Sequence, residues 1–139
     1  MGSTNYTELM GESPALRVTW VKNTNSGQYF DLLRLDLNSS YFSSNPYGMY
    51  LIWYVAPANS KAIKVGHGYL KSEFLNARQN PQVLQYSSKG QIKVAWFLGT
   101  SSTLIYFDQI EAYLDSRYVP VIRIKDYANI SKVSINLLI

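Results

Sequence analysis

Cysteine is absent from this 139-residue sequence, and histidine occurs only once. Without cysteine there is no disulfide framework, no zinc site built on thiolates and no cysteine nucleophile. A single histidine also excludes a catalytic histidine pair and a histidine-rich metal site. Carboxylates, tyrosines and backbone groups remain as the available chemistry, and any bound metal should be a hard cation with oxygen ligands.

Long hydrophobic runs are missing as well. No stretch approaches the roughly 18 consecutive apolar residues that a membrane-spanning helix needs. The first residues have neither a basic start nor an apolar stretch, so they lack the pattern of a signal peptide. We therefore expect a cytoplasmic protein that has no membrane partner.

The residues that are present suit one compact core. Hydrophobic residues make up 47% of the chain and charged residues 16%, a balance typical of a globular domain rather than of a disordered chain. We expect residues 15–139 to form a single domain, because the length fits one core. The polar residues 1–14 should form a flexible arm.

Four segments have the pattern of β-strands. Residues 16–22 alternate apolar and polar side chains, whereas residues 48–55 form an almost continuous apolar run that suits a strand buried on both faces. Residues 62–66 and 91–98 are further candidates. The turn-forming residues 57–60 predict that 48–55 and 62–66 pair as an antiparallel hairpin, in which 48–55 is a central strand.

Helical spacing of apolar residues follows two of these strands. Gly66, His67 and Gly68 should end the second hairpin strand before a helix over residues 69–79, which covers one face of the sheet. A second helix lies within residues 102–118, with Ser101 or Ser102 as its cap, and ends by Pro120.

The order of these elements is β-β-α-β-α, with extra strands at both ends. Residues 16–22 supply the first of these and residues 133–139, which have strand composition, supply an edge strand at the other end. The sequence therefore predicts an α+β fold, in which helices cover a small mixed or antiparallel sheet.

Positive charge gathers in one region of the chain. Between residues 61 and 93 there are six Lys or Arg residues, and Glu73 is the only acid. Such a region attracts phosphate, although a solvated lysine-rich face has the same composition. The candidate DNA or RNA contacts are Lys61, Lys64, Lys71, Arg78 and Lys89.

Two short signatures stand on the predicted hairpin: Gly48-Met49-Tyr50 and Lys64-Val65-Gly66. Further along the chain come "KVGHGYLKSEFLNAR", "QIEAYLDSRYVP" and "VSINLL", in an order that covers nearly the whole sequence. Together these strings resemble the GIY-YIG nuclease superfamily. Its hallmark is two hairpin strands that carry Gly-Ile-Tyr and Tyr-Ile-Gly, followed by a helix, a strand and a helix that bears a glutamate.

The resemblance implies phosphodiester hydrolysis assisted by a divalent metal ion. It places Tyr50 at the first signature tyrosine and Glu111 at the glutamate that would bind Mg²⁺ or Mn²⁺ if the protein is active. Lys64 stands in place of the second tyrosine, Glu73 in place of the helix arginine and Ala77 in place of a histidine. Glu73 puts negative charge where the transition state needs positive charge, a loss that typically costs about 10²-fold or more in rate.

The candidate catalytic set is Tyr50, Lys64, His67 and Glu111. Three of them also have a structural interpretation: Tyr50 as a buried strand tyrosine, His67 as a surface loop residue and Glu111 as part of a solvated acidic face with Asp108 and Asp115. Because Lys64 and Glu73 carry opposite charges at positions that should face each other, we expect them to form an ion pair in the former phosphate site.

Three functions stay open at this point. The first is a GIY-YIG-like domain that has lost or strongly reduced its nuclease activity and retains nucleic-acid binding. The second is an active metal-dependent endonuclease with a rearranged site. The third is a protein-interaction domain that uses a tyrosine-rich surface, whose protein partner the sequence does not identify.

Overall fold

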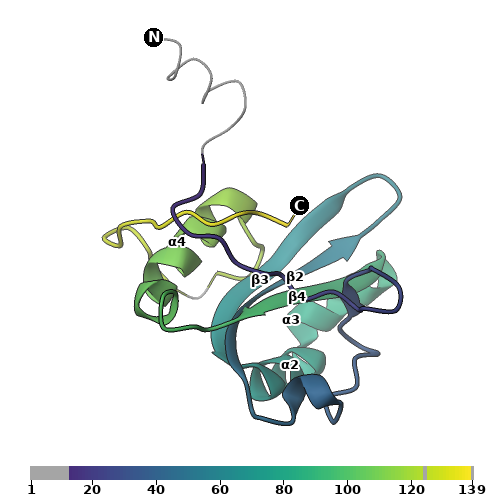
Figure 1. Ribbon diagram of the computed structural model, residues 1–139. Helices are drawn as coiled ribbons and strands as arrows, with labels where there is room; N and C mark the ends of the chain where they lie inside the picture. The colour runs from purple at the N-terminus through teal and green to yellow at the C-terminus, as the bar shows by residue number, and fades with distance from the viewer. Residues whose placement is uncertain (1–12, 124, 139) are drawn as a thin grey trace.

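The chain folds around one four-stranded antiparallel sheet, shown in the computed structural model of Figure 1. The structure describes residues 13–123 and 125–138. The strands lie in the order β1-β4-β2-β3. Their bounds are Phe30–Asp31 for β1, Tyr47–Val55 for β2, Ser60–Tyr69 for β3 and Gln91–Leu98 for β4.

Helices cover both faces of this sheet (Figure 1). On one face lie α2 (Leu70–Gln79) and the short α3 (Pro81–Leu84), and on the other lies α4 (Phe107–Tyr118). Short 3₁₀ turns occupy Ser40–Phe42, Gln85–Ser88 and Leu104–Tyr106. The predicted α+β class is confirmed. Within the described part of the chain, no helix is both long enough and apolar enough to cross a membrane.

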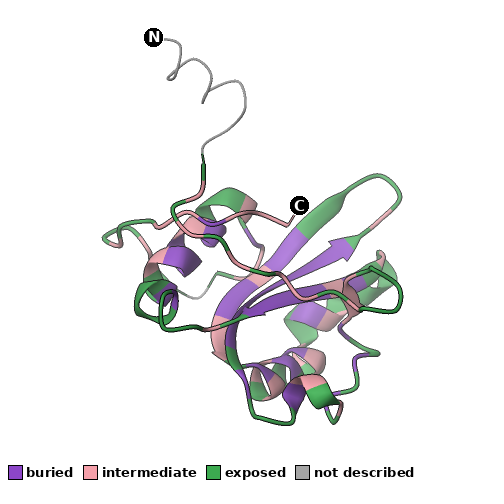
Figure 2. Ribbon diagram, in the orientation of Figure 1, coloured by how far each residue is buried: buried purple, intermediate pink, exposed green. Residues whose placement is uncertain are grey.

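Strand β2 lies at the centre of two hydrophobic cores. All of its residues except the two at its ends are buried, as Figure 2 shows in purple. Tyr50 and Ile52 face the α2 side together with Phe74, whereas Met49 and Leu51 face the α4 side. Burial on both faces explains why β2 is almost entirely apolar, since alternate side chains of a strand point to opposite faces.

The β2–β3 hairpin confirms the predicted pairing, but the second strand is longer than expected. Gly66, His67 and Gly68 do not end it, because β3 continues to Tyr69 and pairs with β2 along its whole length. Helix α2 then begins at once, at Leu70. Gly66 and Gly68 therefore lie in an extended strand and not in a turn. Because they have no side chain, Tyr50 and Glu73 can approach this strand closely.

The strands predicted near the two ends of the chain are wrong. Residues 16–22 and 133–138 run beside each other in extended form, but the only ladder contact between them in the described chain is a single parallel bridge from Leu16 to Ile135. The Asn136 side chain takes over the pairing, because its Oδ1 accepts from the Val18 N–H at 2.7 Å and its Nδ2 donates to the Val18 carbonyl at 2.9 Å.

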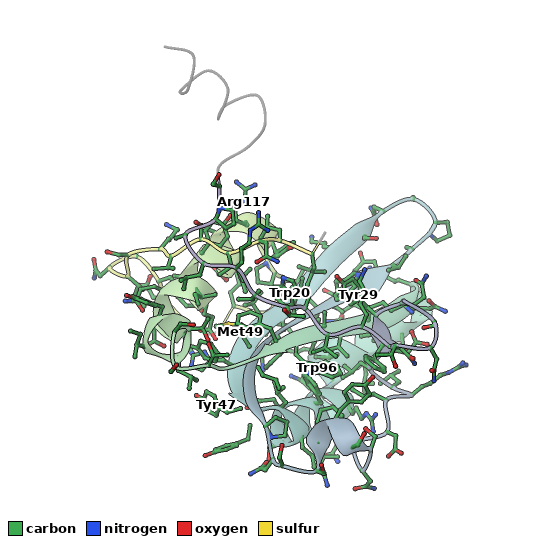
Figure 3. The ribbon with its side chains drawn as sticks, in the orientation of Figure 1. Trp20, Tyr29, Tyr47, Met49, Trp96 and Arg117 are labelled. Carbon is green, nitrogen blue, oxygen red and sulfur yellow. The ribbon has the colours of Figure 1, made fainter. Side chains whose placement is uncertain are left out.

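The alternating pattern of residues 16–22 reflects packing against the sheet, to which the Val21 N–H also donates a backbone hydrogen bond, at 2.8 Å from the Trp96 carbonyl of β4. Trp20 packs edge-on against Phe97 with 5.0 Å between ring centroids, and it lies on the opposite side of β4 from Trp96 (Figure 3). The predicted arm, residues 1–14, falls almost wholly outside the described residues, and Ile139 of the predicted tail strand does so too.

The start of α4 also differs from the prediction. The α-helix begins at Phe107, after the 3₁₀ turn Leu104–Tyr106, and no side chain caps it, so neither Ser101 nor Ser102 is its cap. The Thr103 hydroxyl accepts from the Thr100 N–H at 2.9 Å and stabilises the turn that precedes the helix. The helix ends at Tyr118, before Pro120, as predicted.

Arg78, at the end of α2, holds the loop after β1. Its Nε donates to the Leu32 carbonyl at 2.8 Å, and its Nη2 donates to the Leu35 carbonyl. Both leucines are buried, so these carbonyls would otherwise lose their contact with water. Arg78 is therefore a structural residue, which leaves its guanidinium engaged within the fold.

We expect Arg78→Lys to lower the free energy of unfolding by about 2 kcal/mol, because an ammonium group cannot bind both carbonyls with the geometry of a guanidinium fork. Urea denaturation followed by tryptophan fluorescence measures the change. The matched control is Arg117→Lys on the exposed end of α4, which should shift stability by less than about 0.5 kcal/mol. Equal effects of the two variants would contradict the role given to Arg78.

Candidate functional site

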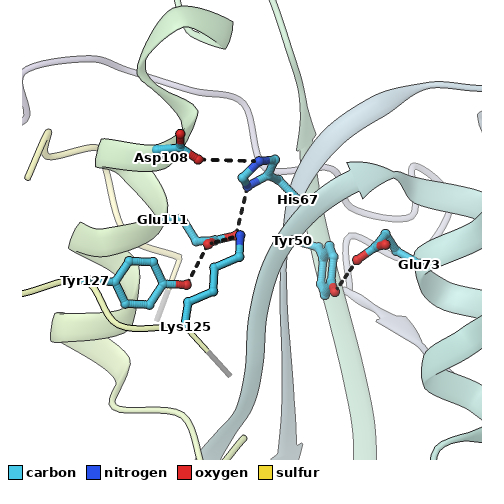
Figure 4. Close-up of polar contacts among 7 residues, drawn as sticks. All are labelled: Tyr50, His67, Glu73, Asp108, Glu111, Lys125 and Tyr127. Atoms are coloured by element: carbon cyan, nitrogen blue, oxygen red, sulfur yellow. Dashed lines mark hydrogen bonds and ion pairs between the residues drawn. The ribbon is translucent and has the colours of Figure 1, made fainter. Parts of the chain in front are cut away.

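The four predicted catalytic residues converge on one cleft. A cavity of about 230 Å³ is lined by Tyr50, Lys64, His67 and Glu111, together with residues of α2, α4 and the segment after α4. It straddles strand β3, with Glu73 of α2 on one side and Glu111 of α4 on the other (Figure 4). The fold thus brings residues as far apart in the sequence as Tyr50 and Glu111 into one cleft.

Glu111 is buried, and both oxygens of its carboxylate accept hydrogen bonds. The residue is 1% exposed. Its Oε1 accepts from His67 Nδ1 at 2.8 Å, and its Oε2 accepts from Lys125 Nζ at 2.8 Å and from the Tyr127 hydroxyl at 2.6 Å. Burial alone would raise the pKa of Glu111, but these three donors outweigh it and lower the pKa to about 2. Glu111 is therefore ionised at neutral pH.

The acidic-face interpretation is wrong for two of its three residues. Asp115, one helical turn beyond Glu111, is 5% exposed and pairs with Arg123, whose Nε donates to Asp115 Oδ1 at 3.1 Å. Asp108 alone is exposed, and its carboxylate lies 3.8 Å from His67 Nε2. The buried side of α4 thus presents Glu111 and Asp115 to the segment that follows the helix.

His67 is a residue of the cleft and not of a surface loop. It lies in β3, its side chain is 14% exposed, and it stands between the carboxylates of Glu111 and Asp108 (Figure 4). Because the ionised Glu111 can only accept a hydrogen bond, the proton in this contact belongs to His67 Nδ1. That bond fixes the orientation of the imidazole ring.

Tyr50 is completely buried in β2, and its hydroxyl donates to Glu73 Oε1 at 2.8 Å. Burial, followed by the negative charge of Glu73, raises the pKa of Tyr50 far above its usual range, so the phenol stays protonated at neutral pH. Gly66 makes room for this side chain, because a Cβ at position 66 would lie 2.6 Å from the Tyr50 hydroxyl oxygen. The burial of Tyr50 agrees with its structural interpretation as a buried strand tyrosine.

The predicted ion pair between Lys64 and Glu73 is wrong. Both side chains are described, and no ion pair joins them. Glu73 accepts the Tyr50 hydroxyl instead, while Lys64 Nζ lies 6.0 Å from the centroid of the Tyr50 ring. Glu73 therefore accepts its hydrogen bond from Tyr50 and not from Lys64, and the Lys64 ammonium faces the cleft.

The residues of the cleft do not fit a divalent cation. A hard cation needs several oxygen ligands with free lone pairs, whereas both oxygens of Glu111 already accept hydrogen bonds, one of them from an ammonium group. Among the described residues no group of three His, Asp or Glu side chains is arranged to hold a metal ion. The Lys125 ammonium supplies positive charge at the carboxylate that the resemblance assigns to Mg²⁺ or Mn²⁺.

The five predicted nucleic-acid contacts do not form one surface around this cleft. Lys64 is the only one of them among its lining residues, and Arg78 is bound to backbone carbonyls. Lys71 Nζ donates to Asn38 Oδ1 at 3.1 Å, and Lys89 Nζ lies 5.6 Å from the centroid of the Tyr86 ring. Lys61 is exposed near the start of β3.

Sequence reasoning missed the side chains that complete the cleft, which are Arg123, Lys125 and Tyr127. The signal was a period of two in "RIKDY", because alternate residues of an extended segment point to the same side. In the structure Arg123 reaches Asp115 of α4, and Lys125 and Tyr127 reach Glu111.

Comparison with known proteins gives no significant match: no family model, no curated protein and no solved structure is similar to this chain. The resemblance to the GIY-YIG nucleases therefore stays a prediction that rests on the sequence strings.

We expect the low pKa of Glu111 to make folding pH-dependent. The unfolded chain takes up this proton near pH 4.5, whereas the native protein takes it up only near pH 2, so stability present above pH 4.5 is lost as the pH falls through this window. The loss should be about 2 kcal/mol at pH 3 and about 3 kcal/mol at pH 2. Urea titrations at pH 7, 4 and 3 measure the part above pH 3, and Glu111→Gln should flatten the dependence. An equally steep loss in Glu111→Gln would assign the effect to other carboxylates.

Proposed function

We propose that this protein is a GIY-YIG-like domain that binds nucleic acid and has lost, or strongly reduced, its nuclease activity. The observation that carries the proposal is the hydrogen-bonded carboxylate of Glu111, which accepts from His67 on one oxygen and from Lys125 and Tyr127 on the other. Three of its roughly four acceptor sites are thus filled, and a tethered ammonium group already neutralises its charge, so it is a poor ligand for a divalent metal ion.

The other parts of the expected chemistry are impaired as well. Tyr50 is a buried neutral phenol that donates to Glu73, so it does not supply a phenolate that activates water. Glu73 brings negative charge to the position where an arginine would stabilise the transition state. Ala77 is buried in the core against the sheet and has no group that titrates. Hydrolysis therefore lacks a phenolate at Tyr50 and a guanidinium at position 73, and the Glu111 carboxylate already holds an ammonium group.

Phosphate binding has better support than hydrolysis. The Lys125 and Arg123 side chains are 48% and 46% exposed, whereas the carboxylates that hold them are almost fully buried. Their outer N–H groups therefore remain open to solvent, and the Lys64 ammonium faces the same cleft. These three cations balance the three carboxylates of the lining, Glu73, Glu111 and Asp115, so phosphate binding without a metal ion would depend on the solvent-facing N–H groups and not on a net positive charge of the cleft. We keep the cytoplasm as the proposed location.

A second candidate is an active endonuclease with a rearranged site. It draws support from the convergence of Tyr50, Lys64, His67 and Glu111 on one cleft. A third is a protein-interaction domain, supported by the exposed side chains of Tyr47, Tyr69 and Ile105. Cleavage and binding experiments separate the three.

We expect no cleavage of plasmid or single-stranded DNA above background with Mg²⁺ or Mn²⁺, because the carboxylate needed for the metal is already occupied. The assay follows plasmid nicking and shortening of a labelled strand on a gel. Glu111→Ala serves as the matched variant and should give the same background. Metal-dependent cleavage that disappears in Glu111→Ala would establish the active nuclease instead.

Binding to DNA or RNA should weaken steeply with salt and should not change when EDTA is added. Each phosphate contact contributes about 0.7 to the slope of log affinity against log salt for a single strand. The double variant Lys64→Gln with Arg123→Gln should therefore lower that slope by about 1.4 in fluorescence-anisotropy titrations. Lys132 is an exposed lysine outside the cleft, so Lys132→Gln is the charge-matched control for each of the two substitutions. Absence of any salt-sensitive binding would favour the protein-interaction domain.

A further inference from the structure

Two exposed tyrosines stand opposite each other on the hairpin, next to the cleft. Tyr47 of β2 and Tyr69 of β3 are direct cross-strand partners. Tyr47 is 37% exposed and Tyr69 is 54% exposed. Their rings meet at right angles with 5.1 Å between centroids. A pair of large aromatic rings in solvent at the end of a sheet calls for an explanation, because aromatic residues usually bury most of their surface.

The two tyrosines are not equivalent, because Tyr47 is fixed from behind. Its ring stacks on Phe107 with 6.0 Å between centroids and 20° between planes, and Phe107 is buried at the first residue of α4. The His67 ring also lies 6.0 Å from it. The contacts with Phe107 and His67 therefore fix the Tyr47 ring. The Tyr47 ring in turn packs against Tyr69, whose ring is the more exposed of the two.

The tyrosine pair is continuous with the cleft. His67 lines the cleft, packs on Phe107 at 5.5 Å and lies on the same face of β3 as Tyr69, two residues before it. One surface thus runs from the cations Lys64 and Lys125, past His67 and the exposed carboxylate of Asp108 beside it, to an aromatic ring. Cations that meet phosphates, next to rings on which bases stack, form the usual combination of a single-strand binding site.

We propose that the ligand is single-stranded nucleic acid, with one base stacked on Tyr69 while phosphates of the same strand contact Lys64, Arg123 and Lys125. This inference rests on the proposed function and adds the class of ligand. A duplex fits less well, because its bases are already stacked on one another and present no free face to Tyr69. The cations beside the tyrosines favour a polyanion over an apolar protein surface as the occupant of this face.

The test uses the full chain and three labelled probes of about 12 nucleotides: a thymidine strand, an abasic strand with the same phosphates, and a duplex. Wild-type protein should bind the thymidine strand most tightly. Tyr69→Ala should weaken that binding about 10-fold or more, and should leave binding of the abasic strand and the slope of affinity against salt unchanged. Tyr69→Phe keeps the ring and should bind as the wild type does.

The outcomes separate the two proposals. Equal binding of the thymidine and abasic strands by wild-type protein, or an unchanged affinity in Tyr69→Ala, overturns the single-strand inference and leaves phosphate binding by the cleft in place. Preference for the duplex overturns the inference in the same way. Failure of wild-type protein to bind any of the three probes overturns the proposed function itself. Thermal unfolding of each variant shows whether a loss of binding comes from a loss of folded protein.

Discussion

The carboxylate of Glu111 is the interaction on which the site depends. A buried negative charge is tolerated only when donors surround it, and here three donors come from two parts of the chain: His67 from β3, and Lys125 and Tyr127 from the segment after α4. The same contacts hold the sheet, the helix and the following segment together. The charge of Glu111 thus assembles the cleft through its contacts with His67, Lys125 and Tyr127.

The path of β3 through the cleft divides that site into two halves. On the α2 side, the Tyr50 hydroxyl passes beneath Gly66 to reach Glu73. On the α4 side, His67 projects from the next position of the strand toward Glu111. One stretch of backbone therefore sets the separation of the two halves, so a shift of the β2–β3 register would displace both at once.

The sequence predicts those features of the structure that are determined by residues close together in the chain, and it predicts contacts between distant segments less well. The hairpin and α2 could be predicted because dense apolar runs and helical spacing mark burial directly, as in β2. Convergence of Tyr50 and Glu111 followed from the resemblance. The Lys64 ion pair failed because nothing in the sequence indicates that the Tyr50 hydroxyl reaches Glu73 first. Lys125 was missed because its partner is chosen by how the chain turns back after α4, which residue spacing does not specify.

The side-by-side run of residues 16–20 and 134–136 has a consequence for how the chain tolerates rearrangement. The Leu16 N–H donates to the Ser134 carbonyl at 3.1 Å, and Trp20 Nε1 donates to the Asn136 carbonyl at 2.8 Å, so the first and last described segments lie side by side and parallel (Figure 1). A linker that runs back along this pair, with new termini opened in the exposed loop 57–59, would give a circular permutant. By the same geometry the whole fold is suited to insertion into a loop of a host protein.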